Sequence, residues 1–166
     1  MTQDTANIEP LLNKESRTKV SSTLDKSVGK KHLTDGSPET CWTSKQNLPQ
    51  FVSIDFDQPV IPKVVHFTFQ GGFVGTRCKL YGRPGGGGGD DASSTAAAGE
   101  EILISDQIYP EDNNRAQVFD LPENLKPIKH LKFVFEESSD MFGRITIYNM
   151  QIYGRVLEEA GQDAIS

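Results

Sequence analysis

Residues 33–44 read Leu-Thr-Asp-Gly-Ser-Pro-Glu-Thr-Cys-Trp-Thr-Ser, and this stretch decides the fold. Asp35-Gly36 is a tight-turn dipeptide, because Asp bonds its own backbone two residues on and Gly accepts a positive φ. Ser37-Pro38-Glu39 has the order of a helix start, with a capping Ser, a Pro at the first helical position and a Glu near the positive end, and it predicts one helical turn. The only tryptophan, Trp42, follows at once. A polar turn that runs directly into a large aromatic residue predicts a loop pinned to a core by Trp42.

Short segments with β-strand patterns surround this loop. Apolar and polar residues alternate most clearly in 50–56, 63–70 and 129–136. Residues 144–156 are also rich in β-forming residues, but Asn149 and Gln151 interrupt the alternation and predict a bulge. Weaker strand patterns occupy residues 18–24, 76–81, 101–105 and 116–121. About eight short strands separated by Pro, Gly, Asn and Asp, with no helical period over three turns, predict an all-β antiparallel sandwich or jelly roll.

The composition permits one domain and excludes several classes of protein. The chain has 166 residues and a formal net charge of −6, so it lacks the basic surface of a nucleic-acid-binding protein. It has no apolar run of the ~18 residues that a membrane span requires, and its polar, acidic first residues do not have the pattern of a signal peptide. The two cysteines, Cys41 and Cys78, lack metal-site spacing, and we expect them to be reduced in an intracellular protein.

We expect three stretches to lie outside the core of this single domain, which spans residues 17–156. Residues 1–16 and 157–166 are polar, and we interpret them as tails. Residues 82–100 contain five consecutive glycines followed by Asp, Ala, Ser and Thr. Because so many glycines lose too much entropy on ordering, we interpret 82–100 as a flexible insertion at a loop tip.

The first loop matches the Asp-Gly-x-x-x-Thr-x-Trp signature of discoidin-like domains, also called coagulation factor 5/8 type C or galactose-binding-like domains. Several other motifs then occur in a specific order: Lys-Lys-His-Leu at 30–33, Phe-Gln-Gly-Gly-Phe at 69–73, Tyr-Pro-Glu-Asp-Asn-Asn at 109–114 and Phe-Gly-Arg-x-x-Ile-Tyr at 142–148. With these motifs the chain resembles, over roughly residues 20–156, the nuclear receptor 2C2-associated protein family of discoidin-like proteins.

This resemblance implies a non-enzymatic protein-binding module that acts as a transcriptional co-regulator, repressing through its partner. The implied partner is a nuclear receptor or another nuclear complex, and the implied location is the nucleus, the cytoplasm or both. Two alternatives stay open: a discoidin-like subunit of a ciliary transport complex and a carbohydrate-binding module of the same fold. The glycan alternative is weaker, because sugar binding needs exposed aromatic platforms and we expect Trp42 to be buried.

Candidate catalytic residues are scattered. His32, His66 and His130 have no spacing typical of a zinc site, and Cys41 lies in the loop that Trp42 pins to the core. We therefore predict that the chain is not an enzyme and requires no cofactor.

Structural calcium is the one ion that the resemblance implies. In discoidin-like domains the first loop often holds calcium, and the ligands here would be side-chain oxygens of Asp35 and Thr40, carbonyl oxygens of Leu33 and Ser37, and a further oxygen near Met150 or Gln151. The alternative is that Asp35 only caps its turn and Thr40 only caps the short helix. A single carboxylate is a weak attraction for calcium, which prefers six to eight oxygens.

Three loops compete as the partner-binding surface. Phe73 follows two glycines, Asp112, Asn113 and Asn114 form a polar loop, and residues 138–144 carry Met141, Phe142 and Arg144. Large apolar side chains and arginine dominate binding hot spots, so we favour residues 138–144, with Arg144 as a bidentate contact at the rim. Each aromatic residue also has an ordinary alternative role, which is to fold back onto the core.

Overall fold

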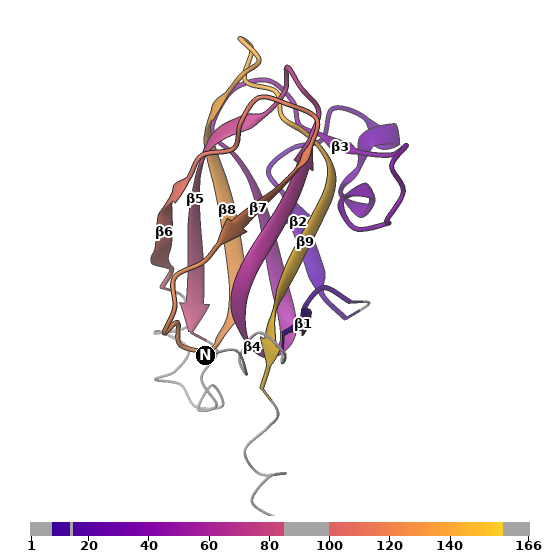
Figure 1. Ribbon diagram of the computed structural model, residues 1–166. Coiled ribbons are helices and arrows are strands. Elements are labelled where there is room, and N and C mark those ends of the chain that lie inside the picture. Colours follow the sequence, from indigo (N-terminus) through magenta and orange to yellow (C-terminus); the bar gives the residue numbers. More distant parts are fainter. Residues whose placement is uncertain (1–7, 14, 85–99, 158–166) are drawn as a thin grey trace, which may run out of the picture.

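The computed structural model describes residues 8–13, 15–84 and 100–157. These residues form an antiparallel β-sandwich with two short 3₁₀ helices (Figure 1), which confirms the predicted all-β class. The described strands are β1 (Glu9–Pro10), β2 (Arg17–Val20), β3 (Trp42–Thr43), β4 (Gln50–Phe69), β5 (Gly75–Pro84), β6 (Ile102–Ile108), β7 (Ala116–Asp120), β8 (Ile128–Ser138) and β9 (Thr146–Val156). The helices are η1 (Lys26–Val28) and η2 (Lys30–Leu33).

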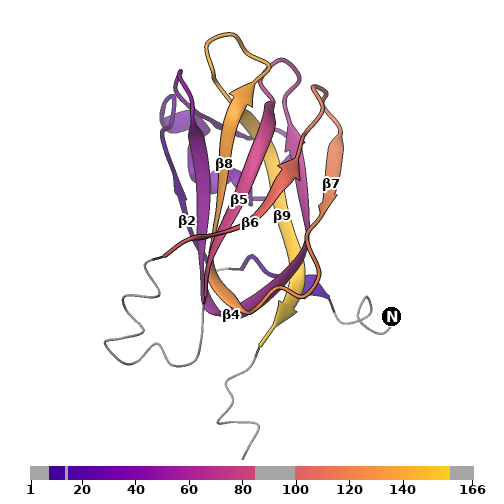
Figure 2. The ribbon, with the colours of Figure 1, turned by 90° about the vertical axis from the view of Figure 1, so that its left-hand side faces the viewer.

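Strand β4 belongs to both layers of the sandwich. Its first part, from Gln50 to Asp55, pairs with β8 and lies beside β2, whereas its second part, from Val60 to Phe69, pairs with β9 and β7. The two layers are therefore β2-β4-β8-β5-β6 and β1-β9-β4-β7, and Figure 2 shows them on either side of the core. The sequence predicted two strands, 50–56 and 63–70, where the chain forms one bent strand, which has an irregular pairing with β8 between Asp55 and Val60.

The predicted bulge lies at the start of β9. Thr68 of β4 pairs with Asn149 while Phe69 pairs with Ile147, so Tyr148 is an extra residue on β9. β9 begins at Thr146, two residues later than predicted, because Arg144 and Ile145 direct their N–H groups to the side chains of Asp140 and Ser44. The extra residue shifts the alternation of inward- and outward-facing side chains, and this shift lies where Asn149 interrupts the apolar pattern of the sequence.

Four phenylalanines join the layers at the centre of the core. Phe67 and Phe69 come from one layer, Phe133 and Phe135 come from the other, and all four are fully buried. The ring of Phe67 meets Phe133 edge-on at 5.2 Å between centroids, and Phe69 meets Phe135 edge-on at 5.9 Å. Edge-to-face pairs of this kind add about 0.5–1.5 kcal/mol each beyond the area they bury. The alternation in 63–70 and 129–136 predicted these inward-facing residues.

Trp42 is fully buried, as predicted, and fixes the first loop to the sandwich. It pairs with Ile147 of β9 through β3, and its Nε1 donates a hydrogen bond to the carbonyl oxygen of Ser22 at 2.9 Å. This bond satisfies the only polar atom of the indole, which a buried tryptophan needs. The loop of 33–44 is thus held by an aromatic side chain inside and by hydrogen bonds outside.

Three local predictions were wrong. Residues 37–39 form a turn in which the Ser37 hydroxyl accepts a hydrogen bond from the Glu39 N–H at 3.2 Å, and no helix starts there. The strand predicted over 18–24 ends at Val20, because Ser21 and Ser22 turn their hydroxyls to the Gln50 side chain. The sandwich also begins before Arg17, since Glu9–Pro10 pair with β9 and Leu11 is buried.

Most residues of the proposed tails and insertion, namely 1–7, 14, 85–99 and 158–166, lie outside the described residues. β5 ends at Pro84 and β6 begins at Ile102, both at the end of the sandwich opposite to the turn between β8 and β9 (Figure 1). Leu157 still bonds the carbonyl oxygen of Pro59 at 2.9 Å. Within the described ranges, no helix is long and apolar enough to cross a membrane.

We predict that Trp42→Ala lowers the free energy of unfolding by ~3–5 kcal/mol, the usual range for removing a buried large aromatic side chain. Urea denaturation followed by circular dichroism measures the change. Leu24→Ala is the matched control, because Leu24 lies near the same loop and its side chain is 46% exposed. The control should change stability by no more than ~0.5 kcal/mol. Equal stability of Trp42→Ala and the control would contradict the role of Trp42 as the anchor.

Candidate protein-binding loop end

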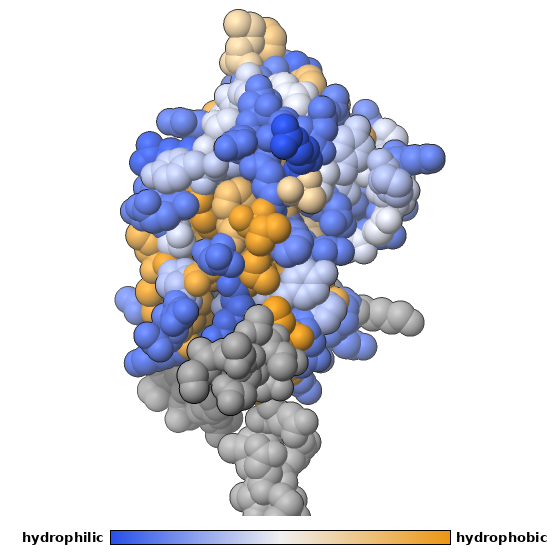
Figure 3. All heavy atoms as spheres, in the orientation of Figure 1, coloured by the Kyte–Doolittle hydropathy of each residue, from blue (hydrophilic) through white to orange (hydrophobic). Residues whose placement is uncertain are grey.

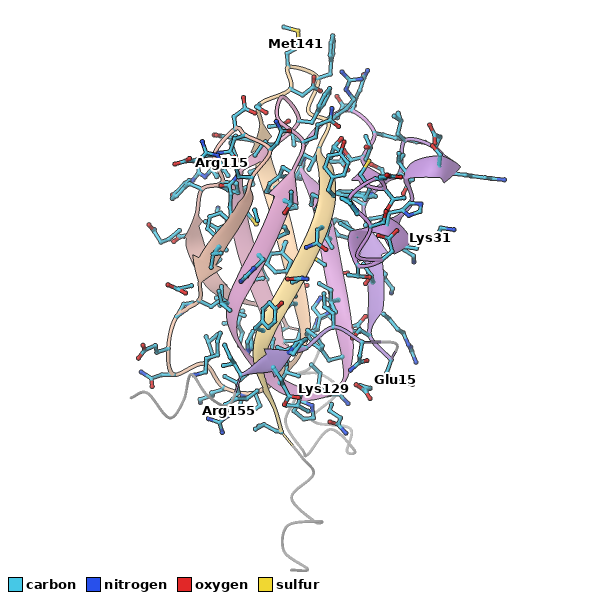
Figure 4. All side chains as sticks on the ribbon, turned by 45° about the vertical axis from the view of Figure 1, so that its right-hand side comes forward. Glu15, Lys31, Arg115, Lys129, Met141 and Arg155 are labelled. Carbon is cyan, nitrogen blue, oxygen red and sulfur yellow. The ribbon has the colours of Figure 1, made fainter. Side chains whose placement is uncertain are left out.

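Four loops meet at one end of the sandwich, which we call the loop end: residues 45–49, 70–74, 111–115 and 138–144. Backbone and side-chain hydrogen bonds join them. Asn47 N–H donates to the Phe142 carbonyl at 2.8 Å, and Ser139 N–H donates to the Val74 carbonyl at 2.9 Å. Figure 4 shows this end, with Met141 at its tip. The three loops that the sequence treated as competing candidates therefore form one surface.

An internal ion pair shapes the loop of residues 138–144. The Arg144 guanidinium donates from Nε to Asp140 Oδ2 at 3.0 Å and from Nη2 to Asp140 Oδ1 at 3.2 Å. These hydrogen bonds lower the pKa of Asp140 and raise that of Arg144. Arg144 was predicted as a bidentate contact for a partner, but its bidentate contact is made inside the loop. Its role in the described geometry is to position its neighbours.

Arg144 also holds two aromatic rings. Its guanidinium carbon lies 5.2 Å from the centre of the Phe73 ring and 5.6 Å from the centre of the Phe142 ring. Both distances fall within the ~6 Å range of cation–π attraction. Phe73 is half-buried, whereas Phe142 is exposed.

The polar loop bonds the neighbouring turn, although Asp112 and Asn114 are exposed. Asp112 and Asn114 accept hydrogen bonds from the N–H groups of Gly72 and Gly71, at 2.8 Å and 2.7 Å. The Asn113 side chain accepts from the Arg115 N–H at 2.9 Å and closes its own turn. These three side chains lie at the loop end, and their hydrogen bonds hold the loops in place.

Two apolar side chains remain free at the tip. Met141 is 87% exposed and Phe142 is 52% exposed. Figure 3 shows pale orange, apolar atoms projecting there above a mostly blue, hydrophilic rim. Leu48 adds a further exposed apolar side chain from the adjoining loop. An apolar tip on a hydrogen-bonded base is typical of a binding surface that is organised before its partner arrives.

Other residues fix this tip, and sequence patterns alone did not reveal them. Gly143 has a φ of +82°, and a Cβ there would lie 3.0 Å from the backbone nitrogen of Asn47, so only glycine fits. Asn47 itself has a φ of +84°. Asp140 stands four residues before Arg144, but this spacing favours an ion pair only on a helix, and residues 138–144 are not helical.

The loop with the predicted calcium ligands lies on the flank of the sandwich, beside η2. The Asp35 carboxylate accepts hydrogen bonds from the Thr40 hydroxyl at 2.6 Å, the His32 ring Nδ1 at 2.9 Å and the Ser37 N–H at 2.9 Å. Led by the bond from Thr40, these interactions lower the pKa of Asp35 from 3.8 to about 2. The carboxylate is therefore the centre around which this turn closes.

The fit of calcium to this loop is incomplete. Thr40 Oγ1 lies 2.6 Å from Asp35 Oδ2 and 3.5 Å from the Ser37 carbonyl oxygen, so three of the predicted ligand atoms are close together. Hydrogen bonds from Thr40, His32 and Ser37 already occupy the Asp35 carboxylate, so a calcium ion would compete with them for its oxygens. Within the described residues, no three side chains of His, Cys, Asp or Glu form a metal-binding cluster. The calcium site stays a prediction.

The cysteines have the environment of packing residues. Cys78 is buried in the core, and burial raises the pKa of its thiol above the ordinary value. Cys41 is half-buried, with its sulfur 3.7 Å from the Thr43 hydroxyl. Both are free thiols. A buried thiol with a raised pKa is a poor nucleophile, because the reactive species is the thiolate.

Comparison with known proteins places the chain in a family. No protein-family model matches it. It is 38% identical over 149 residues to the zebrafish (Danio rerio) nuclear receptor 2C2-associated protein, covering 88% of this chain and 96% of that protein. The human protein of the same name is 36% identical over 143 residues, covering 84% and 92%. The chain belongs to the nuclear receptor 2C2-associated protein family.

Solved structures show the fold of this family member. A family 32 carbohydrate-binding module of Clostridium perfringens NanJ, solved with galactose, has a TM-score of 0.67 at 17% identity and covers 88% of this chain and 98% of its own. The C-terminal domain of a Bacteroides fragilis chitobiase has a TM-score of 0.68 at 16% identity, covering 90% and 100%. The predicted discoidin-like, galactose-binding-like fold is thereby confirmed. The relatives are named as associated proteins, and the NanJ neighbour is named as a binding module.

We predict that the Asp35 carboxylate stabilises the fold in a pH-dependent way. Because its pKa is lower in the folded chain than in the unfolded chain, its contribution is fully present above the unfolded value, 3.8, and is lost as the pH falls through about 2. Asp35→Asn should therefore lower the melting temperature at pH 7, and the difference from the wild type should shrink between about pH 4 and pH 2. Thermal melts of both proteins across this range measure it. A difference that does not change with pH would contradict the assignment.

The calcium prediction has its own measurement. If the loop binds calcium, excess calcium should raise the melting temperature relative to a chelator by mass action, and Asp35→Ala should abolish the rise. Superimposable melts of the wild type with calcium and with chelator would mean that hydrogen bonds alone hold the loop.

Proposed function

We propose that the chain is a non-enzymatic adaptor that binds a protein partner through its loop end and acts as a transcriptional co-regulator in the nucleus or cytoplasm. The single observation that carries this proposal is the exposed pair Met141 and Phe142 on a base of hydrogen-bonded loops. The names of the relatives indicate the partner: a nuclear receptor of the 2C2 type.

The loop end has the properties of a hot spot for protein binding. Met141 and Phe142 provide apolar surface that loses water on contact, and a rigid base reduces the entropy lost on binding. The Asp140–Arg144 pair neutralises its own charge, so a partner does not have to bury an unpaired ion. A flexible methionine beside a fixed aromatic ring also adapts to the shape of an apolar groove.

Glycan binding finds less support in the same residues. Trp42, the sole tryptophan, is buried and cannot stack on a sugar ring. The solved carbohydrate-binding modules share the fold at 16–17% identity, which carries no information about the ligand. A glycan array is therefore a useful negative control for the protein-binding assay.

The test is the affinity of the purified chain for purified human nuclear receptor 2C2, measured by biolayer interferometry. We predict that Met141→Ala with Phe142→Ala weakens binding at least tenfold, or about 1.4 kcal/mol, and leaves the melting temperature nearly unchanged. Arg144→Ala should weaken binding as well, because it releases Phe142 and Phe73 from their common cation.

The matched control is Ile102→Ala with Val118→Ala. These side chains are 54% and 56% exposed, but they lie on β6 and β7 away from the loop end. The control should bind like the wild type. If the loop variant and the control bind equally well, the receptor-binding surface lies elsewhere, and if the wild type does not bind, the receptor is not the partner.

A further inference from the structure

The outer edge of β9 has a gap in its pairing. On this edge β9 pairs with β3 at Thr146 and Ile147, and with β1 at Tyr153 and Gly154. Leu11 N–H also donates to the Ile152 carbonyl at 2.8 Å. In the described chain, no strand pairs with residues 148–151 on this side. Because these four residues have no partner strand on the outer side, the open edge is about 13 Å long at ~3.3 Å per residue.

The backbone of Met150 faces this gap. In an antiparallel strand, every second residue directs both its N–H and its C=O to the same edge. Because Ile152 bonds Leu11 on the outer edge and the pairing with β4 is regular from Asn149 to Ile152, Met150 also points outward. The described residues supply no partner strand there, so one donor and one acceptor of the sheet stand open.

A hollow of about 500 Å³ lies at the same place. Its walls come from β9, from the chain around β1 and β2, and from the turn that follows η2, and they include Pro10, Thr18, Thr34, Gly36, Asn149 and Gln151. This volume is within the range of about 300–1,000 Å³ that is typical of ligand sites. Figure 4 shows β9 in front, with Lys31 of η2 to one side of this region and Glu15 below it.

The lining of the hollow is uncharged. Among the described residues that line it there is no Lys, Arg, Asp, Glu or His. Asp35 lies between Thr34 and Gly36 in the sequence, but its carboxylate is turned to His32, Ser37 and Thr40. The hollow therefore offers hydroxyl, amide and backbone groups beside apolar residues such as Leu12 and Ile152, and these match a neutral ligand that both donates and accepts hydrogen bonds.

We propose that this gap binds a short, extended and uncharged peptide segment of a protein partner, which adds a strand to the outer edge of β9. A peptide main chain supplies the C=O and N–H groups that the open N–H and C=O of Met150 need as hydrogen-bond partners. The length of the gap fits about four extended residues, and the uncharged walls select small neutral side chains such as Ser, Thr and Val. Charged peptides are rejected because their ionised groups lose water without finding a counter-ion.

This site is separate from the loop end, since it lies along the middle of β9 and the loop end lies before Thr146. It rests on the proposed function only in expecting a protein as the ligand. A partner that uses both surfaces gains affinity because the second contact becomes intramolecular. The two sites can therefore be tested independently.

The probe is a phage-displayed library of random eight-residue peptides, selected on the full chain. Thr18→Glu with Thr34→Glu places two charges in the hollow, and Gly36→Asn is a second variant that narrows it. Gly36 has a φ of +75°, no atom lies within 4 Å of where a Cβ would stand, and Asn tolerates this backbone conformation. Gln58→Glu with Gln107→Glu is the control, because it adds the same charge at two exposed positions outside the hollow.

We expect the selected peptides to be uncharged, to bind at least tenfold more weakly to both hollow variants and to bind normally to the control and to Met141→Ala with Phe142→Ala. N-methylation of their central residues should abolish binding, and the bound peptide should protect the Met150 amide from hydrogen exchange. The proposal is overturned if no selected peptide depends on the hollow, or if the Met150 amide is already protected in the free chain. Loss of binding in the loop variant alone would place the peptide at the loop end.

Discussion

The bent strand β4 is the constraint on which the rest of the structure depends. Its first residues pair with β8 and its last residues pair with β9 and β7, so one continuous backbone carries hydrogen bonds in both layers. Phe67 and Phe69 on its second part then pack against Phe133 and Phe135 of the opposite layer. Because one strand links the two layers and the rings interlock between them, neither layer separates without breaking the core, and we expect the sandwich to unfold cooperatively.

This core gives the loops a rigid base. β8 and β9 place the two ends of the 138–144 loop, and β4 and β5 place the ends of the 70–74 turn. Hydrogen bonds within and between the loops then hold them: Asp140 holds Arg144, Asp112 and Asn114 hold Gly72 and Gly71, and Asn47 holds the Phe142 carbonyl. Several polar side chains at this end thus support the loops, whereas Met141 and Phe142 are exposed.

Much of the fold was predictable from the sequence, because strands have a period of two that is visible in a short window. The alternation in 50–56, 63–70 and 129–136 identified the inward-facing residues, and the Asp35-to-Trp42 signature identified the pinned loop. The pairing of Glu9–Pro10 with β9 was not predictable, since two residues carry no period and the partner strand is far away in the sequence. Local propensity also failed at Ser37–Glu39, where the side chains of Asp35 and Ser37 close a turn instead.

The candidate site was predictable only as a set of loops. Composition identified Phe73, Asp112 to Asn114 and Met141 to Arg144, but it gave no information on which side chains bond to each other. The distinction between Phe142, which is exposed, and Arg144, which is held by Asp140, depends on contacts across the loop. The gap beside β9 had no signal in the sequence, because it arises from where β1 and β3 stop.

The position of the connection between β5 and β6 has a practical consequence for biophysical work. Pro84 and Ile102 stand at the end of the sandwich opposite to the exposed Met141. A fluorophore, a biotin group or a fused reporter attached between them would therefore point away from the loop end. Immobilisation by such a handle would leave the loop end accessible to a partner in solution, and this natural separation makes the domain a convenient scaffold for displaying engineered loops.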